Sequence, residues 1–332
     1  MKNKILVIGS GAWGTALSTV LDNSNNNEVW IYGINNQQLE EIKKGYNSKV
    51  LKDLTFKPIL NAISNFDEII NDMDFIIIAI PTDKIEEFLI SNKDKINTNT
   101  IIINTSKGFD LKNNEPITYL IEKILNRDIV TLIGASFATE LVEKNKTIVN
   151  IVGKNIDICN KANLIFSNND YFICENITEN IDSLLYISSM KNIFAIFMGF
   201  LSFKEKSINT KSCFFIEIMN EIKRYLISKN INTDNLISHS ALGDVFLTCI
   251  STKSRNFNFG YDVAKYGIKK ALSENTKVIE GFTTINNLRE CFFKNDEYPF
   301  FKTLIDLIDE EISSDNFVDE IWKILLLKKR IK

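Results

Sequence analysis

The chain has 332 residues, enough for about two domains at roughly 150 residues each. Lys and Arg number 39 against 42 Asp and Glu, so the formal charge of −3 supplies no basic excess for a phosphate backbone, and we expect no nucleic-acid partner. With 45% hydrophobic and 24% charged residues, the composition is that of folded globular proteins and excludes wholesale disorder.

Cysteine and histidine usage argues against a metal centre. The five cysteines lie far apart without a C-x-x-C pair, and His239 is the only histidine. Neither a disulfide framework nor a Ser-His-Asp triad is expected from such a composition. We therefore predict an enzyme or binding protein that uses no metal.

Two segments bear on the location of the chain. The apolar run before Gly9 is too short for a signal peptide. The apolar run Ile193–Phe203 is far below the ~20 residues that span a bilayer and predicts a buried helix. We expect a cytoplasmic chain without an integral membrane segment.

The first half of the chain alternates short β-branched runs with longer amphipathic ones. Such alternation is typical of a parallel sheet with crossover helices, and the two apolar faces of each run indicate a doubly wound sheet. Trp13–Asp22 is predicted as the first helix because its apolar residues recur at helical spacing. Strands are predicted at Ile5–Ile8, Val29–Tyr32, Phe75–Ile80, Ile101–Asn104, Ile129–Ile133 and Thr147–Val152.

The second half changes character from about Asn180 onward. Long runs with apolar residues three and four apart, such as Ser212–Ile227 and Val318–Leu327, predict helices. We therefore expect a dinucleotide-type α/β domain over residues 1–180 and an all-helical substrate-binding domain over residues 181–332.

A glycine motif follows the first predicted strand and opens the first predicted helix. In this context the first glycine permits a tight turn, the second lets the backbone approach a pyrophosphate, and the third allows close helix–strand packing. The N–H groups of the helix N-terminus then face the phosphate anion. The motif predicts a Rossmann-like domain that binds a dinucleotide through Gly9, Gly11, Ala12, Trp13 and Gly14.

The end of the second strand bears on the choice of dinucleotide. An acid about 20 residues past the motif would bind the ribose of NAD, and a basic residue would hold the phosphate of NADP. The chain has neither at Ile34 and Asn35, although Asn35 could bond a ribose hydroxyl. The pattern leans toward NADH and leaves NADPH open.

Seven sequence blocks occur in the order and approximate spacing of the bacterial NAD(P)-dependent glycerol-3-phosphate dehydrogenases, and the chain resembles this family over nearly its whole length. The resemblance implies interconversion of glycerol 3-phosphate and dihydroxyacetone phosphate with NAD(H) or NADP(H), a supply of glycerol 3-phosphate for phospholipid synthesis, and a homodimer. The blocks cover residues 9–17, 106–110, 134–141, 191–196, 242–249, 254–256 and 278–281.

The resemblance also implies the catalytic groups. Lys191 matches the family's catalytic lysine, a base toward the C2 hydroxyl and an acid in the reverse direction. A free lysine with a pKa of ~10.4 is a poor base at neutral pH, so its site must favour the neutral amine by desolvation or a nearby cation. Lys107, matching a second family lysine, could be that cation. Asp244 resembles the partner of the lysine, although a helix N-cap is its alternative interpretation.

Further binding residues follow from the same resemblance. Arg255 and Asn256 look like the substrate-phosphate pair, because an arginine fork beside an amide suits a phosphate dianion. Substrate contacts are implied for Lys107, Gly134, Ser136, Lys191, Asn192, Asp244, Thr248, Ser254, Arg255 and Asn256. Besides the glycine loop, cofactor contacts are implied for Ile34, Lys107, Ala138, Arg255, Val278 and Glu280.

Two departures from the family pattern leave alternatives open. Ala135 stands where the family usually has Pro, which predicts a looser turn before Ser136. Bulky residues at Phe200–Ser207 replace a small-residue stretch and predict an altered loop. The alternatives are a related two-domain hydroxy acid dehydrogenase, which would need a carboxylate clamp, and a catalytically weak dinucleotide-sensing protein that uses the altered loop for a partner.

Overall fold

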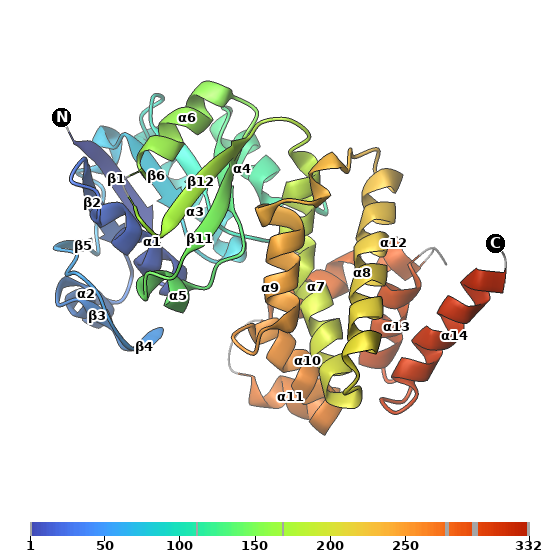
Figure 1. Cartoon of the computed structure of the whole chain (residues 1–332). Coiled ribbons are helices and arrows are strands. Elements are labelled where there is room, and N and C mark those ends of the chain that lie inside the picture. The colour runs from blue at the N-terminus through green and yellow to red at the C-terminus, as the bar shows by residue number, and fades with distance from the viewer. Residues whose placement is uncertain (1, 111, 168, 276–278, 294–297, 331–332) are drawn as a thin grey trace. The chain divides into compact units, whose positions relative to one another are not determined.

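This computed structural model describes residues 2–110, 112–167, 169–275, 279–293 and 298–330 (Figure 1). The chain forms two compact units. Unit 1 comprises Met1–Asp110 with Glu115–Leu185, and unit 2 comprises Leu111–Asn114 with Tyr186–Lys332. The change from one unit to the other falls within the long helix α7 (Asp182–Lys204).

Unit 1 is built on an eight-stranded sheet in the order β12-β11-β10-β7-β6-β1-β2-β5. All six strands expected from the sequence are confirmed, within one to two residues at most ends. The strands of this sheet are β1 (Asn3–Ile8), β2 (Asn27–Tyr32), β5 (Asn61–Ile63), β6 (Phe75–Ile78), β7 (Ile101–Asn104), β10 (Val130–Ile133), β11 (Thr147–Val152) and β12 (Phe172–Ile177).

The sheet is not parallel throughout, which corrects the expectation of a purely parallel sheet. The pairs from β10 across to β5 are parallel, but β11 runs antiparallel to β10 and parallel to β12. Only the five-residue helix α5 (Ala138–Val142) lies between β10 and β11. Because so short a helix cannot carry the chain back along the sheet, β11 returns in the opposite direction.

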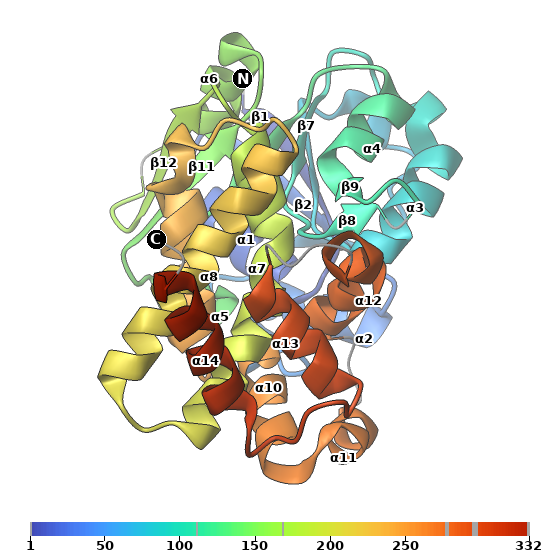
Figure 2. The same cartoon turned by 90° about the vertical axis from the view of Figure 1, so that its right-hand side faces the viewer.

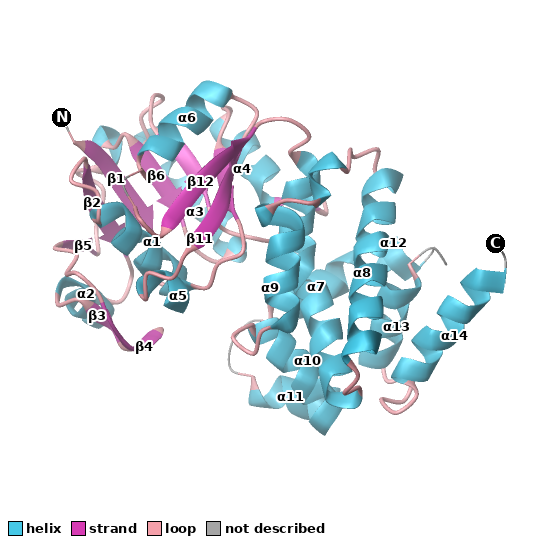
Figure 3. Ribbon diagram, in the orientation of Figure 1, coloured by secondary structure: helices cyan, strands magenta, loops and turns pink. Residues whose placement is uncertain are grey.

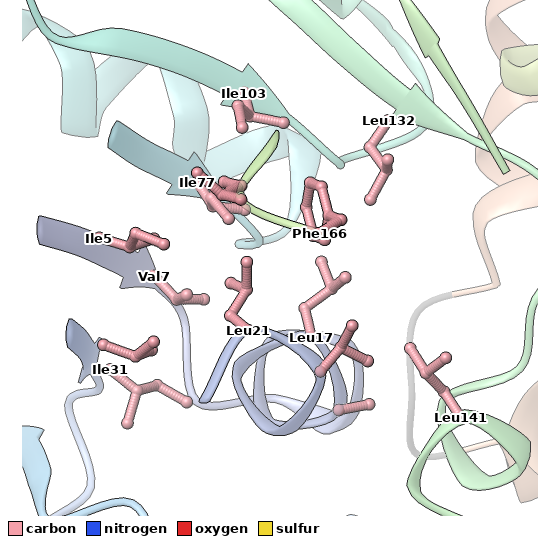
Figure 4. Close-up of a cluster of buried hydrophobic side chains, with 14 of the residues drawn as sticks. Ile5, Val7, Leu17, Leu21, Ile31, Ile77, Ile103, Leu132, Leu141 and Phe166 are labelled. Atoms are coloured by element: carbon pink, nitrogen blue, oxygen red, sulfur yellow. The ribbon is translucent and has the colours of Figure 1, made fainter. Parts of the chain in front are cut away.

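Helices cover both faces of the sheet. Alternate residues of β1 point to opposite faces, so Ile5 and Val7 join the cluster that contains Leu17 and Leu21 of α1, as Figure 4 shows. Leu6 and its alternate neighbours join a second cluster on the other face. The helices of unit 1 are α1 (Ala12–Asp22), α2 (Asn36–Lys43), α3 (Ile85–Asn92), α4 (Ile117–Leu125), α5 and α6 (Ile156–Leu164).

Two small two-stranded sheets complete unit 1. They are antiparallel and lie outside the main sheet. Their strands are β3 (Tyr46–Asn47), β4 (Leu51–Thr55), β8 (Phe109–Asp110) and β9 (Glu115–Pro116). β3 contains Asn47, and β8 begins two residues after the predicted site residue Lys107, so both bear on the geometry below.

The described part of unit 2 contains helices and loops only, as Figure 3 shows, and the expected helical half is confirmed. Ser212–Ile227 lies within α8 and Val318–Leu327 within α14, and α13 lies beside α14 in both Figure 1 and Figure 2. The helices after α7 are α8 (Ile208–Ser228), α9 (Asp244–Ile250), α10 (Arg255–Tyr266), α11 (Ile268–Glu274), α12 (Glu280–Phe293), α13 (Pro299–Ile308) and α14 (Phe317–Arg330).

Helix α7 is longer than its apolar run suggested. Its 23 residues are long and apolar enough to cross a membrane by length and composition, so the apolar run of 11 residues understated the helix. The whole of its most apolar 18-residue window is buried inside the structure. Such complete burial is typical of a core helix.

The prediction of an altered loop at residues 200–207 is wrong for most of that segment. Residues 200–204 are the last turn of α7, and only residues 205–207 lie between α7 and α8. Phe200 is fully buried with its ring centroid 4.5 Å from that of Phe317, and the Phe203 ring lies 5.1 Å from that of Tyr261. These bulky side chains extend the helix because they have aromatic partners to pack against.

Candidate active site

Two glycines of the glycine motif are required by the backbone around them. Gly9 follows β1 with φ +121°, and a Cβ there would lie 2.4 Å from the carbonyl oxygen of Ala79. A Cβ on Gly14 would lie 1.9 Å from the carbonyl oxygen of Gly9. The turn and the close packing of α1 therefore both depend on residues without side chains.

Gly11 meets a different environment. No atom lies within 4 Å of the place where its Cβ would be, so the space beside it is open. Gly11 is the N-cap of α1, with no side-chain cap hydrogen bond, and no acidic residue stands in the first turn that Ala12 and Trp13 begin. Unpaired N–H groups and the helix dipole then favour an anion. These features fit the pyrophosphate of a dinucleotide.

The end of β2 carries no charge at the predicted ribose position. Ile34 is 91% exposed. Asn35 is the N-cap of α2, and its side-chain oxygen accepts a hydrogen bond of 3.0 Å from the Gln38 amide. The side-chain carbonyl of Asn35 therefore already caps a helix. The sequence signal for this cap is an Asn directly before an amphipathic run.

Three predicted substrate residues of unit 1 meet on one oxygen. Lys107 Nζ donates to the carbonyl oxygen of Gly134 at 3.5 Å, and Ser136 Oγ donates to the same oxygen at 3.2 Å. Lys107 follows β7 and Gly134 follows β10, and these strands are neighbours in the sheet. Ala138 opens α5 just beyond this turn. The carboxyl ends of parallel strands are where α/β sheets bind ligands.

In unit 2, the predicted catalytic lysine pairs with the predicted aspartate. Lys191 Nζ lies 2.5 Å from Asp244 Oδ1, and the two side chains are 8% and 1% exposed. Asp244 begins α9 directly after the π-helical turn His239–Gly243, and the N-cap position belongs to Gly243 without a side-chain cap bond. The N-cap alternative for Asp244 is therefore wrong.

The environment of Lys191 differs from the simplest expectation for a base. Lys191 is buried, and the structure pairs it with the Asp244 carboxylate. The carboxylate attracts the ammonium strongly in this weakly solvated place. Such a pair fixes the position of the lysine amine, as a general acid or base requires.

A second group of predicted residues gathers around Glu280. Asn192 Nδ2 donates to Glu280 Oε2 at 2.8 Å, and Arg255 lies 3.6 Å from Glu280 Oε1. The arginine and glutamate side chains are 57% and 45% exposed, so this pair adds little stability. Asn256 is buried, and its Oδ1 accepts a 2.9 Å bond from the Gly281 amide. Because the Asn256 oxygen faces Gly281, the Asn256 NH2 group faces the other way, where it can donate a hydrogen bond.

Two predicted hydroxyl donors already have local partners. Thr248 Oγ1 donates to the Asp244 carbonyl oxygen one turn earlier, at 2.6 Å. Ser254 is the N-cap of α10, and its Oγ accepts from the Phe257 amide at 3.3 Å. Their predicted substrate contacts stay predictions. Val278 lies outside the described residues.

Three glycines that were not predicted as site residues hold the helices of this group together. A Cβ on Gly199 of α7 would lie 1.9 Å from the Phe257 carbonyl oxygen, and one on Gly260 of α10 would lie 1.9 Å from that of Ile196. A Cβ on Gly281 would lie 2.4 Å from the Asn192 carbonyl oxygen. Backbone contact at these crossings brings α10 and α12 close to α7. The available signal was Gly199, an isolated glycine inside the predicted buried helix.

Cys249 stands beside the lysine–aspartate pair but is an inert thiol. It is fully buried, and burial raises the pKa of its thiol, with smaller opposing effects from Lys191 and Asp244. Burial also raises the pKa of Cys159 to about 11, whereas Cys213 is exposed. We expect iodoacetamide at neutral pH to alkylate Cys213 while Cys249 stays unmodified, since the thiolate is the reactive form. Peptide mapping by mass spectrometry measures both, and early labelling of Cys249 would contradict this burial.

The fold and these groups define a class. A doubly wound sheet with an uncapped glycine-loop helix, joined to a helical unit with a buried lysine–aspartate pair, is the plan of a two-unit dinucleotide-dependent oxidoreductase. In the part of the chain that the structure describes, no group of three or more His, Cys, Asp or Glu could hold a metal ion.

Comparisons with known proteins identify the family. Residues 4–159 match the model of the NAD-dependent glycerol-3-phosphate dehydrogenase N-terminus, and residues 180–319 match that of its C-terminus. The chain belongs to this family. It is 34% identical to a glycerol-3-phosphate dehydrogenase [NAD(P)+] of Malacoplasma penetrans, covering 96% of this chain and 95% of that protein. A protein of the same name from Mycoplasma mobile is 30% identical, with 96% of each chain covered.

Solved structures agree on the fold. The glycerol-3-phosphate dehydrogenase of Coxiella burnetii superposes with a TM-score of 0.86 at 22% identity, covering 97% of this chain and 99% of that chain. That of Plasmodium falciparum gives a TM-score of 0.84 at 23% identity, covering 96% and 95%.

Proposed function

We propose that this chain interconverts dihydroxyacetone phosphate and glycerol 3-phosphate with NAD(H) or NADP(H). The observation that carries the proposal is the buried Lys191–Asp244 pair, in the part of the chain that matches the C-terminal model of this family. A buried ion pair is costly to desolvate, so a chain that keeps one in a helical core has a use for it. In this proposal, the pair serves to exchange a proton with the carbonyl oxygen of the substrate.

The chemistry divides between cofactor and protein. When bound, the nicotinamide supplies or accepts the hydride. Lys191 donates its proton to the C2 oxygen as the ketone is reduced and takes it back in the reverse direction. Asp244 keeps the lysine oriented and charged until that transfer. Lys107 polarises the substrate carbonyl or holds the substrate phosphate.

The other predicted residues bind the substrate and the cofactor. Arg255 anchors the substrate phosphate with its charged guanidinium and Asn256 with its neutral amide. Further substrate contacts come from Gly134, Ser136, Asn192, Thr248 and Ser254. Glu280 orients Arg255 and Asn192 through the contacts described above. Residues 1–180 serve as the dinucleotide domain and residues 181–332 as the substrate domain. The cofactor also contacts the glycine loop, Ile34, Ala138 and Val278.

The preferred dinucleotide is NADH. A 2′-phosphate would find only the uncharged Ile34 and Asn35 at the end of β2. We expect Ile34→Arg to lower the KM for NADPH by about tenfold, because a guanidinium pairs with the phosphate, while the KM for NADH changes little. Ile90→Arg, on the half-exposed face of α3, is the matched control. A wild-type preference for NADPH would contradict this assignment.

The enzyme acts in the cytoplasm as a homodimer and supplies glycerol 3-phosphate for phospholipid synthesis. The family supports these proposals. Sedimentation velocity measures the oligomeric state, and a monomer at micromolar concentration would contradict the dimer.

A substrate panel separates this function from its two alternatives. Purified chain with NADH is offered dihydroxyacetone phosphate, unphosphorylated dihydroxyacetone and a set of 2-oxo acids. Turnover that requires the phosphate supports the proposal. Reduction of the 2-oxo acids with no phosphate effect would establish the hydroxy acid dehydrogenase, and NADH binding without any turnover would establish the sensor.

A further inference from the structure

The carbonyl oxygen of Ser10, inside the glycine loop, accepts three side-chain hydrogen bonds. Gln38 Nε2 donates at 2.8 Å, Asn47 Nδ2 at 3.2 Å and Thr15 Oγ1 at 3.3 Å. All four residues are buried, and they come from the loop, α1, α2 and β3. A single carbonyl oxygen with three side-chain donors is fixed in direction.

The donors also fix one another. Ser10 Oγ donates to Gln38 Oε1 at 3.2 Å, Gln38 Nε2 lies 3.0 Å from Asn47 Oδ1, and Asn47 Nδ2 lies 3.0 Å from Thr15 Oγ1. Each amide therefore has one orientation in which its oxygen accepts and its nitrogen donates. A Cβ on Gly33 would lie 2.2 Å from Ser10 Oγ, so the end of β2 must be glycine for this cluster to form.

Further hydrogen bonds fix the backbone segments that carry the Gln38 and Asn47 side chains. Asn35 Oδ1 accepts a hydrogen bond from the backbone N–H of Gln38 at 3.0 Å. The Glu41 carboxylate accepts from both the amide and the hydroxyl of Ser48, each at 2.8 Å, directly after Asn47. These bonds lower the pKa of Glu41, so the carboxylate stays charged and keeps its hold near neutral pH.

The direction of the Ser10 carbonyl decides where the next amide points. The described residues contain no cis peptide, and in a planar trans peptide the C=O and the following N–H point in opposite directions. With the Ser10 carbonyl turned inward to its three donors, the Gly11 N–H points to the opposite side; Gly11 is exposed, and no atom lies within 4 Å of its Cβ position. That side is the one a pyrophosphate would occupy.

We propose that Gln38 and Asn47 are positioning residues for dinucleotide binding, which hold the Ser10–Gly11 peptide with its N–H aimed at the pyrophosphate. The inference rests on the proposed role of the glycine loop. Pre-aimed donors cost the ligand no reorganisation on binding. The hydrogen bonds of both residues go to the glycine loop and to each other, so we expect both to act on cofactor affinity.

The test compares two buried asparagines of unit 1. Asn47→Leu removes the amide below the loop. Asn27→Leu is the matched control, because Asn27 is equally buried and its amide donates to the carbonyls of Leu21 and Ile165, at 2.9 and 2.8 Å, at the other end of α1 and β2. NADH affinity by calorimetric titration, Tm without cofactor, and steady-state kinetics are measured for wild type and both variants.

We expect both variants to lose Tm and only Asn47→Leu to lose NADH affinity, by about tenfold, the size of one hydrogen bond to a charged group. Its KM for NADH should rise likewise, with kcat and the KM for dihydroxyacetone phosphate within about threefold of wild type. If Asn47→Leu does not fold, Gln38→Glu serves instead, because it keeps the shape and loses the donor. Gln38→Glu is expected to give the same affinity loss.

Two outcomes would count against the inference in different ways. Equal NADH affinity in wild type and Asn47→Leu, with a lowered Tm, would make the cluster purely structural and overturn the inference alone. Failure of the wild-type chain to bind NADH would overturn the role of the glycine loop, and this inference with it.

Discussion

Lys191→Ala is expected to lower kcat by about 10²- to 10⁴-fold, the usual worth of a positioned acid or base. The reason is that Lys191 is the amine that the structure pairs with the Asp244 carboxylate. Cofactor affinity should stay within about twofold, since the glycine loop belongs to unit 1. The measurement is steady-state kinetics beside NADH titration.

The control for Lys191→Ala is Lys223→Ala, which removes an exposed lysine from α8 of the same helical unit. It should leave kcat unchanged. Undiminished kcat in Lys191→Ala would remove this lysine from the mechanism, whereas loss of NADH affinity in that variant would show that the substitution acts on the cofactor site.

Asp244→Ala is expected to destabilise the fold by about 3–5 kcal/mol, because it leaves the Lys191 ammonium buried without its partner. Activity should fall with it, since the acid loses its orientation. The double variant Lys191→Met with Asp244→Leu replaces both charges by apolar groups of similar size, and it should recover most of the stability but none of the activity.

Urea unfolding of the wild type, the single variant and the double variant measures the stability changes, and assays on the same samples measure activity. A single variant as stable as the wild type would mean that the buried charge is solvated in solution. A double variant as unstable as the single one would assign the loss to packing at this place rather than to charge.

Local sequence patterns predicted the elements that positioned the glycine loop. The runs Ile5–Ile8 and Trp13–Asp22 have the periods of a buried strand and an amphipathic helix; Gly9 stands between them, and Gly14 lies in the first turn of the helix. The edge strand β12 was missed because Cys174, Glu175 and Asn176 interrupt its apolar pattern. Edge strands need no continuous apolar run, so periodicity alone does not find them.

The site was predictable only as far as motifs reach. Lys191 and Asp244 are 53 residues apart, and nothing local in the chain says that they touch. The resemblance supplied that pairing, and the structure confirms it. The amide cluster of Gln38 and Asn47 had no such support, because three donors to one backbone oxygen leave no period, motif or charge pattern behind them.

The misread segment at 200–207 shows how tertiary partners override composition. Phe200 and Phe203 look out of place where a family pattern expects small residues, and a loop was the natural interpretation. Phe317 and Tyr261, 117 and 58 residues further along the chain respectively, supply the aromatic surfaces that make a helix the better solution.

The most direct measurement follows the transferred hydrogen. Purified chain is incubated with dihydroxyacetone phosphate and NADH deuterated at nicotinamide C4, and the product is analysed by mass spectrometry and NMR. The account predicts glycerol 3-phosphate carrying deuterium at C2 from the wild type, and almost none from Lys191→Ala over the same time. Bound but unconsumed NADH, with no labelled glycerol 3-phosphate from the wild type, would contradict it.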